Sequence, residues 1–352
     1  MKTLKAFLSL IILTSGLTMA QTVRPIRDNV GFCWKANEMN LLMKYLSEHD
    51  KITDLGSHKL IAGISPHDDY LYTGNIYYTL YPHIKTKEVV IFGVTHGTVR
   101  KAMNDPRNVL IFDDYDEWQG PYGNVKVSPL RDFIKSKLDK DYQIVSDKAQ
   151  DIEHSIEALV PFLQYYNRDI KITPIMVTGM PYERMEKTSQ QLSDIISEYI
   201  RENHLELGKD IFFLISTDAN HYGKDFDNAP YGEDEAAHKK ATDRDKETGN
   251  KIFNGELTKK KVKELADDFW PELGVNKVCP LWCGRYPIPF GLMTTINIVK
   301  EIAGKKIFGK FLGYSDSWTE GVIPIYHTNM GLTAPFSLKH WVGYASAGFY
   351  LK

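Results

Sequence analysis

The sequence predicts an α/β fold: a single sandwich-like domain with a central mixed sheet and helices on both of its faces. Short runs of β-branched and aromatic residues alternate along the chain with longer amphipathic segments, which is the pattern of strands interleaved with helices. The 352 residues are 43% hydrophobic and 25% charged, so disordered and fibrous classes are excluded. No repeat or low-complexity tract divides the chain, and we expect the domain to span residues 21–352.

The first twenty residues predict a secretory signal peptide. Two lysines precede an apolar core over residues 6–13, and Thr18 and Ala20 place small residues at the −3 and −1 positions of a cleavage site. The apolar run is too short to cross a bilayer as a stable helix, although an uncleaved anchor is the alternative. No later apolar run in the sequence is long enough to span a membrane. We therefore expect a periplasmic or secreted protein.

Strands are predicted from short apolar runs bounded by turn residues. Five of these runs read as buried strands, at residues 59–64, 88–94, 108–112, 170–177 and 210–216. Two late segments alternate between apolar and polar residues and predict further strands, at residues 311–314 and 341–349.

Helices are predicted where apolar residues recur at intervals of three and four. They cover residues 37–48, residues 185–201 and the segment from just after Cys283 to about residue 303. Ser128 before Pro129 predicts an N-cap followed by proline at the first helical position. The charge-rich segment 232–268 predicts two solvated helices that separate at Asn254 and Gly255.

Charge and cysteine content exclude several classes of function. Lys+Arg 43 against Asp+Glu 45 gives a net charge of −2, so no basic surplus favours nucleic acid or anionic lipid as a partner. Three cysteines in 352 residues cannot form a disulfide framework. A Cys279–Cys283 pair remains conceivable in an exported protein, and Cys33 is expected in the core.

Three of the eleven histidines lie just beyond the carboxyl ends of predicted strands. His67 follows the strand at 59–64, His96 follows the strand at 88–94, and His221 follows the strand at 210–216 through a longer loop. In open α/β sheets this edge is where ligands bind. A single histidine there is commonly a loop residue bonded to backbone, but three in equivalent places indicate a site.

Cys283 is the most informative thiol. It precedes an apolar helix and lies two residues from Arg285, and both features should lower its pKa and favour the thiolate. Such a thiolate binds metals or attacks carbon. A buried structural thiol explains the local sequence equally well.

The segment from Glu153 to Glu157 predicts the start of a helix that Pro161 then kinks, with Leu159 in the core. Its spacing does not require metal binding. We expect a structural role, with His154 or Glu157 contributing at the rim of a pocket.

Taken together, these residues resemble the Memo family, also described as protein B of the AmmeMemoRadiSam system. The matching elements follow the family's order along nearly the whole mature chain: Gly31-Phe32-Cys33-Trp34, Ile64-Ser65-Pro66-His67 with Tyr70 and Gly74, Gly93-Val94-Thr95-His96, Glu153-His154-Ser155-Ile156-Glu157 leading to Pro161-Phe162, Ser216-Thr217-Asp218 to His221-Tyr222-Gly223, Cys283-Gly284-Arg285-Tyr286-Pro287-Ile288, Gly313-Tyr314 and Val342-Gly343-Tyr344-Ala345.

The resemblance implies a fold similar to class III extradiol dioxygenases, which hold non-haem Fe(II). It implies a metal site formed by His67, His96 and Cys283. We expect one transition metal ion there, iron or copper: the resemblance favours iron, and the thiolate favours copper. A thiolate in place of the dioxygenase carboxylate departs from the ligand set expected for oxygen activation. His221 matches the acid/base position of the dioxygenases, and Asp218 beside it would orient an imidazole without binding the metal itself. A turn or N-cap role for Asp218 is the plain alternative.

The sequence departs from the resembled family in three ways. His67 is followed by Asp68 and Asp69, where a small residue and glycine are usual, which predicts a more acidic pocket or an extra oxygen ligand. His96 is followed by Gly97, where a second histidine is common. A signal peptide is also unusual for that family.

Three functions follow from these observations. The first is an exported metal-binding protein with redox or dioxygenase-related activity on an unidentified small substrate. The second is a metal-free enzyme with Cys283 as nucleophile, His221 as base and Asp218 as its orienting partner. The third is a non-catalytic pocket for a peptide or small ligand.

Overall fold

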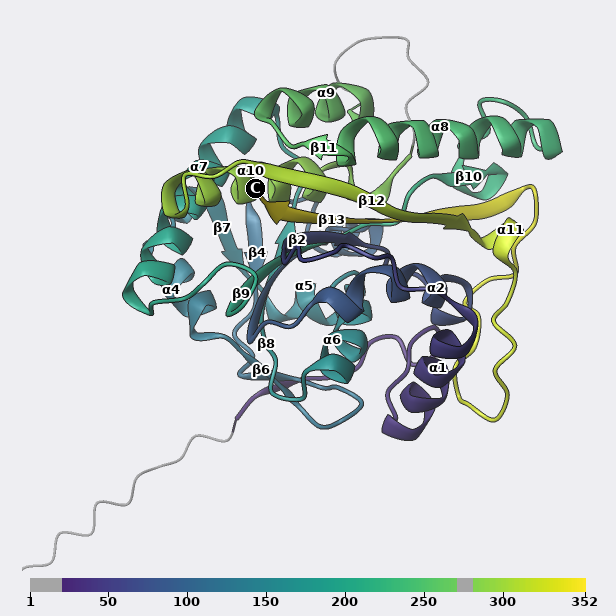
Figure 1. Cartoon of the computed structure of the whole chain (residues 1–352), viewed down its shortest axis with the longest axis horizontal. Helices are drawn as coiled ribbons and strands as arrows, with labels where there is room; N and C mark the ends of the chain where they lie inside the picture. The colour runs from purple at the N-terminus through teal and green to yellow at the C-terminus, as the bar shows by residue number, and fades with distance from the viewer. Residues whose placement is uncertain (1–20, 271–280) are drawn as a thin grey trace, which may run out of the picture.

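The computed structural model describes residues 21–270 and 281–352 (Figure 1). The predicted signal peptide, residues 1–20, lies outside the described residues, and so does Cys279. Strands and helices alternate along the described chain around a mixed sheet, so the predicted α/β class is confirmed. Within these two ranges, no helix is both long and apolar enough to cross a membrane.

The described strands form one extensive sheet. Its main path runs in the order β1-β5-β6-β8-β3-β9-β2-β13-β12-β11, with β4, β7 and β10 pairing beside that path. The strand bounds are β1 (Val23–Arg24), β2 (Leu60–Ser65), β3 (Glu88–Val94), β4 (Leu110–Phe112), β5 (Glu117–Trp118), β6 (Val125–Val127), β7 (Gln143–Val145), β8 (Lys171–Val177), β9 (Ile211–Ser216), β10 (His221–Gly223), β11 (Gly255–Glu256), β12 (Ile307–Asp316) and β13 (His340–Leu351).

The centre of the sheet is parallel. β3 pairs with β8 on one side and with β9 on the other, and β9 pairs with β2, all in parallel. Because parallel strands end at the same edge, the segments that follow β2, β3 and β9 are brought together there. Beyond β2 the sheet becomes antiparallel, since β13 pairs with β2 and with β12.

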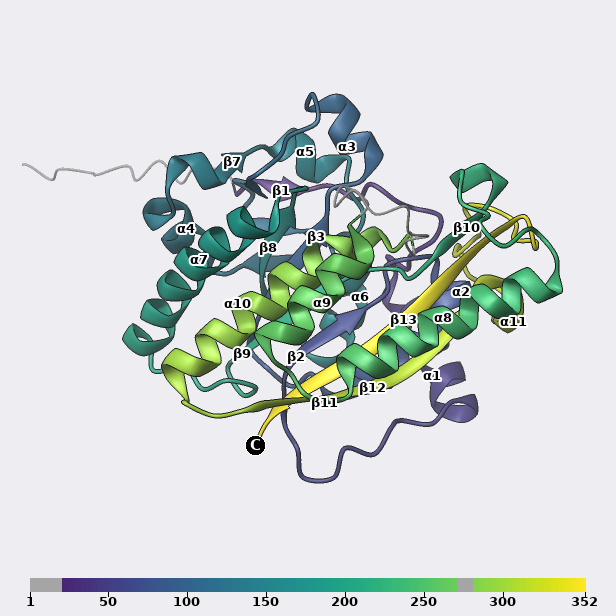
Figure 2. The ribbon, with the colours of Figure 1, turned by 90° about the horizontal axis from the view of Figure 1, so that it is seen from above.

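Alternate residues of the central strands enter two separate hydrophobic cores. In β3, Val90 and Phe92 pack into one core, whereas Val89 and Ile91 pack into the other. Figure 1 shows helices α1, α2 and α6 below the sheet, and Figure 2 shows α7, α9 and α10 across its opposite face. A strand buried on both faces has to be apolar at every position, which is why these runs were recognisable in the sequence.

The helices predicted at residues 37–48, at residues 185–201 and after Cys283 are confirmed, each to within a few residues, but several other helices were not predicted. Their bounds are α1 (Ala36–His49), α2 (Tyr70–Leu80), α3 (Gly97–Ala102), α4 (Pro129–Lys137), α5 (Asp147–Asp151), α6 (Val160–Tyr166), α7 (Tyr182–Glu202), α8 (Glu235–Phe253), α9 (Lys259–Phe269), α10 (Pro287–Ile302) and α11 (Ser317–Glu320). At α4 the Ser128 side chain accepts a hydrogen bond from the Leu130 amide, and Pro129 stands in the first turn, as predicted. The predicted break between two helices at Asn254 and Gly255 is also confirmed.

Two local predictions are wrong. Pro161 does not kink a helix, because it lies in the first turn of α6, where the missing amide hydrogen costs no intrahelical bond. The first helix of the charge-rich segment is not simply solvated, because α8 buries Asp245 and His238 against β12 and β13. Both side chains have hydrogen-bond partners in other elements, and these partners could not be predicted from the helical periodicity of α8.

Candidate metal centre

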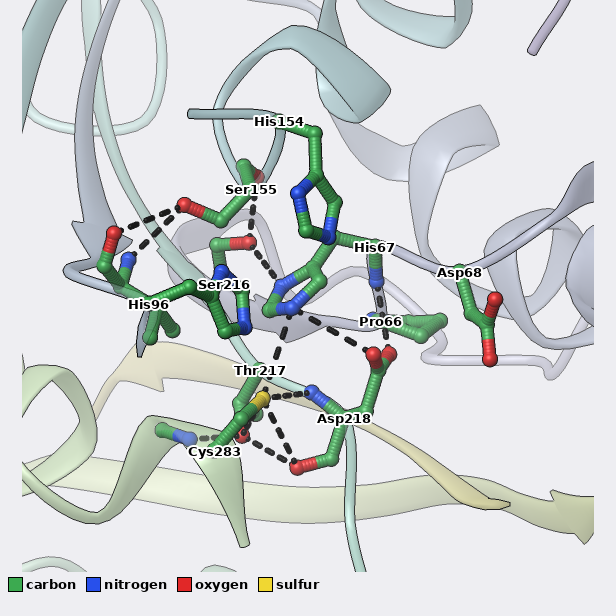
Figure 3. Close-up of polar contacts among 12 residues, drawn as sticks. Pro66, His67, Asp68, His96, His154, Ser155, Ser216, Thr217, Asp218 and Cys283 are labelled. Carbon is green, nitrogen blue, oxygen red and sulfur yellow. Dashed lines mark hydrogen bonds and ion pairs between the residues drawn. The ribbon is translucent and has the colours of Figure 1, made fainter. Parts of the chain in front are cut away.

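Three adjacent strands deliver the side chains of the centre. His67 follows β2 and His96 follows β3, while Ser216 ends the intervening strand β9 and Asp218 follows it. Cys283 comes from a short 3₁₀ turn, Cys283–Arg285, just ahead of α10. Figure 3 shows these side chains converging on the His67 ring.

The hydrogen bonds of His67 fix its tautomer. Its Nδ1 lies 2.7 Å from Oγ of Ser216, and that hydroxyl donates its own proton to the Ser155 carbonyl at 2.6 Å. The Ser216 oxygen must therefore accept from His67, which places the ring proton on Nδ1 and leaves the lone pair on Nε2. Burial lowers the pKa of His67 well below its ordinary value, with the nearby His96 and His154 adding to the effect. The ring is therefore neutral.

His96 is set in the same way by a carboxylate. Its Nδ1 lies 2.8 Å from Oε1 of Glu153, and its backbone amide donates to Oε2 of the same side chain at 2.9 Å. Burial acts to raise the pKa of Glu153, but the charge and hydrogen bonds of His96 outweigh it and hold that pKa well below its usual range. The ionised Glu153 accepts the Nδ1 proton, so Nε2 is the nitrogen of His96 that is available to a metal ion.

His154 is a third imidazole in the centre. Its ring stacks on His96 with centroids 4.6 Å apart and planes 6° apart, and it meets the His67 ring edge-on at 5.5 Å. Burial and the neighbouring His96 lower the pKa of His154 to about 3. All three rings are close enough to share one ion, so His154 is more than a rim residue.

Cys283 faces His67. Its Sγ lies 3.4 Å from Nε2 of His67 and accepts a hydrogen bond from the Asp218 amide at 2.9 Å. Burial, with the charge of Asp218 beside it, raises the pKa of the thiol well above its ordinary value. The expectation of a depressed pKa is therefore wrong, because burial outweighs the proximity of Arg285. A coordinating cation would reverse that balance by stabilising the thiolate directly.

Asp218 belongs to the centre itself. Its Oδ1 accepts from the backbone amide of His67 at 2.9 Å, and its Oδ2 lies 3.3 Å from Nε2 of the same residue. Burial and the charge of Asp68 raise the pKa of Asp218 well above its ordinary value. The carboxyl group is therefore directed at Nε2 of His67, not at the Nδ1 atom that an orienting carboxylate would hold.

The residues predicted to modify the pocket lie elsewhere. The Asp68 carboxylate accepts from the Tyr344 hydroxyl at 2.9 Å, and Figure 3 shows it pointing away from the sulfur. Oδ2 of Asp69 accepts from both the amide and the hydroxyl of Thr333. Asp218, not Asp68 or Asp69, is the carboxylate that the structure brings to the ligand atoms.

His221 occupies the wall of the site. It starts the short strand β10, and its Nδ1 lies 3.3 Å from the Ala219 carbonyl, an acceptor, so this nitrogen holds the ring proton. Burial and the charge of His96 lower the pKa of His221 to about 4. The ring is thus neutral near pH 7, with Nε2 as its basic atom.

The ligand atoms form two overlapping groups in the described chain. His67, His96 and His154 make one, and His67, Asp218 and Cys283 make the other; within each group the atoms lie within 4.8 Å of one another. His67 belongs to both groups, whereas His96 and Cys283 fall in different ones. An ion bound at Nε2 of His67 could take its further ligands from either group. Imidazole nitrogens, a thiol that receives an amide hydrogen bond and one carboxyl group make a donor set that suits a transition metal.

The sequence profile of the Memo-like protein family matches residues 30–321, which cover this whole centre. The chain belongs to the Memo-like protein family. It is 30% identical over 191 residues to a MEMO1 family protein of Pyrococcus furiosus and 30% identical over 188 residues to one of Aquifex aeolicus. These alignments cover 51% and 53% of this chain, and 60% and 62% of the relatives. The chain thus spans about three fifths of the length of those relatives.

In this Memo-like chain, sequence reasoning missed two contributors. Glu153 and Ser216 belong to neither group of ligand atoms. Their hydrogen bonds to Nδ1 nevertheless determine which nitrogen of His96 and of His67 is available to a metal ion. Ser216 is the last residue of β9, so its place between β3 and β2 in the sheet was the missing information. Glu153 lies directly before His154, and that acid–histidine pair was the available signal.

Helix α8 supports the Memo-like centre from behind. Asp245 accepts hydrogen bonds from Nε1 of Trp282 and from the Tyr314 hydroxyl, both at 2.8 Å. Trp282 is fully buried and directly precedes Cys283. This bond fixes the backbone that carries the thiol, which gives the buried carboxyl group of α8 a structural purpose.

Proposed function

We propose that this Memo-like protein is an exported metalloprotein that holds one transition metal ion through His67, His96 and Cys283 and acts in redox chemistry on a small substrate. The observation that carries the proposal is the matched tautomers of the two histidines. Ser216 and Glu153 each engage an Nδ1 atom, which leaves Nε2 of both imidazoles available to a metal ion, and Nε2 of His67 lies 3.4 Å from the Cys283 sulfur. Such outer partners are typical of imidazoles that bind metals.

Iron and copper are the two ions we propose. The resemblance to class III extradiol dioxygenases favours Fe(II). The thiolate favours Cu(I), and Cu(II) stands highest among divalent ions in the affinity order. Magnesium and calcium prefer all-oxygen ligands and do not suit this donor set.

The ion would supply electron transfer and polarisation of a bound oxygen atom. The chain's own residues would position and exchange protons around it. Ser216 and Glu153 hold the two imidazoles in fixed orientations, and His221 offers Nε2 as a base because its ring is neutral near pH 7. The hydrogen bond between Trp282 and Asp245 holds the backbone that places the Cys283 thiol beside His67.

The decisive experiment is metal analysis of the protein reconstituted with iron or copper. Wild type should retain about one ion per chain after removal of loosely bound metal. Cys283→Ala should lose most of it, whereas Cys33→Ala should not, because Cys33 is an equally free thiol that lies outside both ligand groups. Full stoichiometry and affinity in Cys283→Ala would show that the thiolate is no ligand.

That outcome would favour the metal-free cysteine enzyme, for which the structure supplies one specific observation. Nε2 of His67 carries a lone pair and lies 3.4 Å from the Cys283 thiol, which is an arrangement of nucleophile and base. In this form of the alternative the base is His67 instead of His221. Inactivation by a thiol-alkylating reagent, independent of added metal, would support it.

Export is proposed from the first twenty residues alone. We expect cleavage after Ala20 by signal peptidase and release of the mature chain beyond the inner membrane. Intact mass and N-terminal sequencing of the protein from its native host test this. A chain that retains Met1 in the cytoplasmic fraction would contradict it.

A further inference from the structure

A cavity of about 230 Å³ opens beside the proposed metal centre. His96, His221 and Cys283 contribute to its lining, so any molecule bound in it would touch the proposed metal ligands. This volume is below the roughly 300–1,000 Å³ of pockets for drug-sized ligands. The cavity therefore suits a small organic molecule.

Three arginines line this cavity. Arg100 and Arg107 come from the segment after β3, and Arg285 comes from the turn that carries Cys283. Among the described lining residues, Asp105 is the only acid, and its carboxylate pairs with Nε of Arg107 at 2.9 Å. The lining therefore has a surplus of two positive charges, in a chain whose net charge is −2.

The two arginines in excess are well placed. Arg285 is half-buried, with its guanidinium 5.6 Å from the centre of the Tyr286 ring. Arg100 is exposed and folds over Gly97, where a Cβ atom would lie only 3.8 Å from its Nη2 atom. A guanidinium that is partly withdrawn from water binds carboxylate or phosphate more strongly than an exposed lysine does, because its fork matches their oxygens.

The remaining walls are apolar and aromatic. Phe226 packs edge-on against His221, with ring centroids 5.1 Å apart, and Tyr286 fits against Gly179, where a Cβ atom would lie 3.3 Å from its ring. Val94 and Val177 close the side formed by the strands. A cationic end and an apolar body are thus combined in one small space.

We propose that this cavity binds a small organic anion, with its carboxylate or phosphate group at Arg285 and Arg100 and its apolar body against Phe226 and Tyr286. The placement of that body next to a reacting metal rests on the proposed function. The anion-binding site itself depends only on the arginines and the walls, so the two can be tested separately.

Calorimetric titration of the full mature chain tests the proposal. The probes are benzoate, phenyl phosphate and the neutral isostere benzamide, each added to metal-free and to metal-loaded protein. We expect one of the anions to bind metal-free protein at least about tenfold more tightly than benzamide, and to weaken as salt is raised. The preferred anion identifies the head group. Binding of benzamide as tight as that of both anions would overturn the proposal, and so would no detectable binding of either anion.

Variants locate the binding site. Arg285→Gln should weaken anion binding about tenfold or more, and Arg285→Lys should weaken it less. Arg201→Gln is the matched control, because Arg201 is paired with Glu301 on the surface and does not line the cavity. If Arg285→Gln fails to fold, the exposed Arg100→Gln replaces it. Affinity unchanged in both Arg285→Gln and Arg100→Gln would overturn the proposal. Failure of the metal proposal alone would leave arginine-dependent anion binding to the metal-free protein intact.

Discussion

Nε2 of His67 lies 3.4 Å from Sγ of Cys283, although 216 residues separate them in the sequence. Two chain segments create this contact. His67 is held at the end of β2 by Ser216, and Cys283 is held ahead of α10 by the Asp218 amide and by the anchored Trp282. Ser216 is the last residue of β9 and Asp218 lies just beyond it, so this one strand aligns the imidazole with the thiol.

Ser216→Ala should weaken metal binding by roughly 10- to 100-fold without unfolding the protein. The substitution removes the acceptor for Nδ1 of His67, so the ring can change tautomer and orientation. Competition with a chromophoric chelator measures the affinity. Ser189→Ala is the control, because Ser189 is another buried serine that bonds only to a carbonyl of its own helix. Equal losses in both variants would make the effect one of packing.

His154→Ala and Asp218→Asn should each lower metal affinity by less than about tenfold, whereas His67→Ala and His96→Ala should abolish it. The reason is that His154 and Asp218 lie next to the proposed ligands but are not themselves proposed to bind the ion. Chelator competition with all four variants distinguishes the two groups. If His154→Ala is as damaging as His67→Ala, the three histidines are the true ligand set.

His221→Ala should leave metal content unchanged and lower any turnover by roughly 10²- to 10⁴-fold, as expected for a lost base. His221 lines the cavity and belongs to neither ligand group. Elemental analysis and activity are measured on the same preparation. Loss of most of the metal would place His221 among the ligands instead.

Because Asp245 is buried, the free energy of unfolding should fall as the pH rises. Burial raises the pKa of Asp245 to about 7, while the unfolded chain ionises near 3.8. Between these values the folded state holds a proton that the unfolded state has released, so this contribution to stability is complete below about pH 4 and is lost on approaching pH 7.

Urea unfolding of wild type and Asp245→Asn across this range measures the effect. The difference between their free energies of unfolding should change by at most about 1.4 kcal/mol per pH unit. Asp243→Asn is the control, since Asp243 is exposed on the same helix and pairs with Lys239. A difference that stays constant with pH would show that Asp245 is ionised throughout.

The main elements could be predicted from the sequence because local patterns determine them. The strand at Glu88–Val94 is apolar at nearly every position, as burial on both faces requires, and its predicted bounds are those observed. The short strands β1, β5 and β11 were missed. Each of these strands has two residues and depends on pairing with a distant segment, which no local pattern reports.

The candidate site was predictable in part. His67 and His96 lie where strand ends predicted them, and Cys283 lies beside His67. The pKa of Cys283 was predicted in the wrong direction, because burial depends on what covers the thiol and not on its neighbours in sequence. The contributions of Glu153 and Ser216 were hidden for a related reason: each acts across the sheet on a residue far away in the chain.

The place of β9 between β3 and β2 also determines when the centre can exist. The contacts of the centre join residues 57, 149 and 216 positions apart, so the centre cannot form before these distant segments of the chain have come together. A nascent or translocating chain therefore carries the ligands but no centre. If the chain is exported unfolded, the ion is acquired in the compartment where folding ends, and its binding then stabilises the native state by mass action.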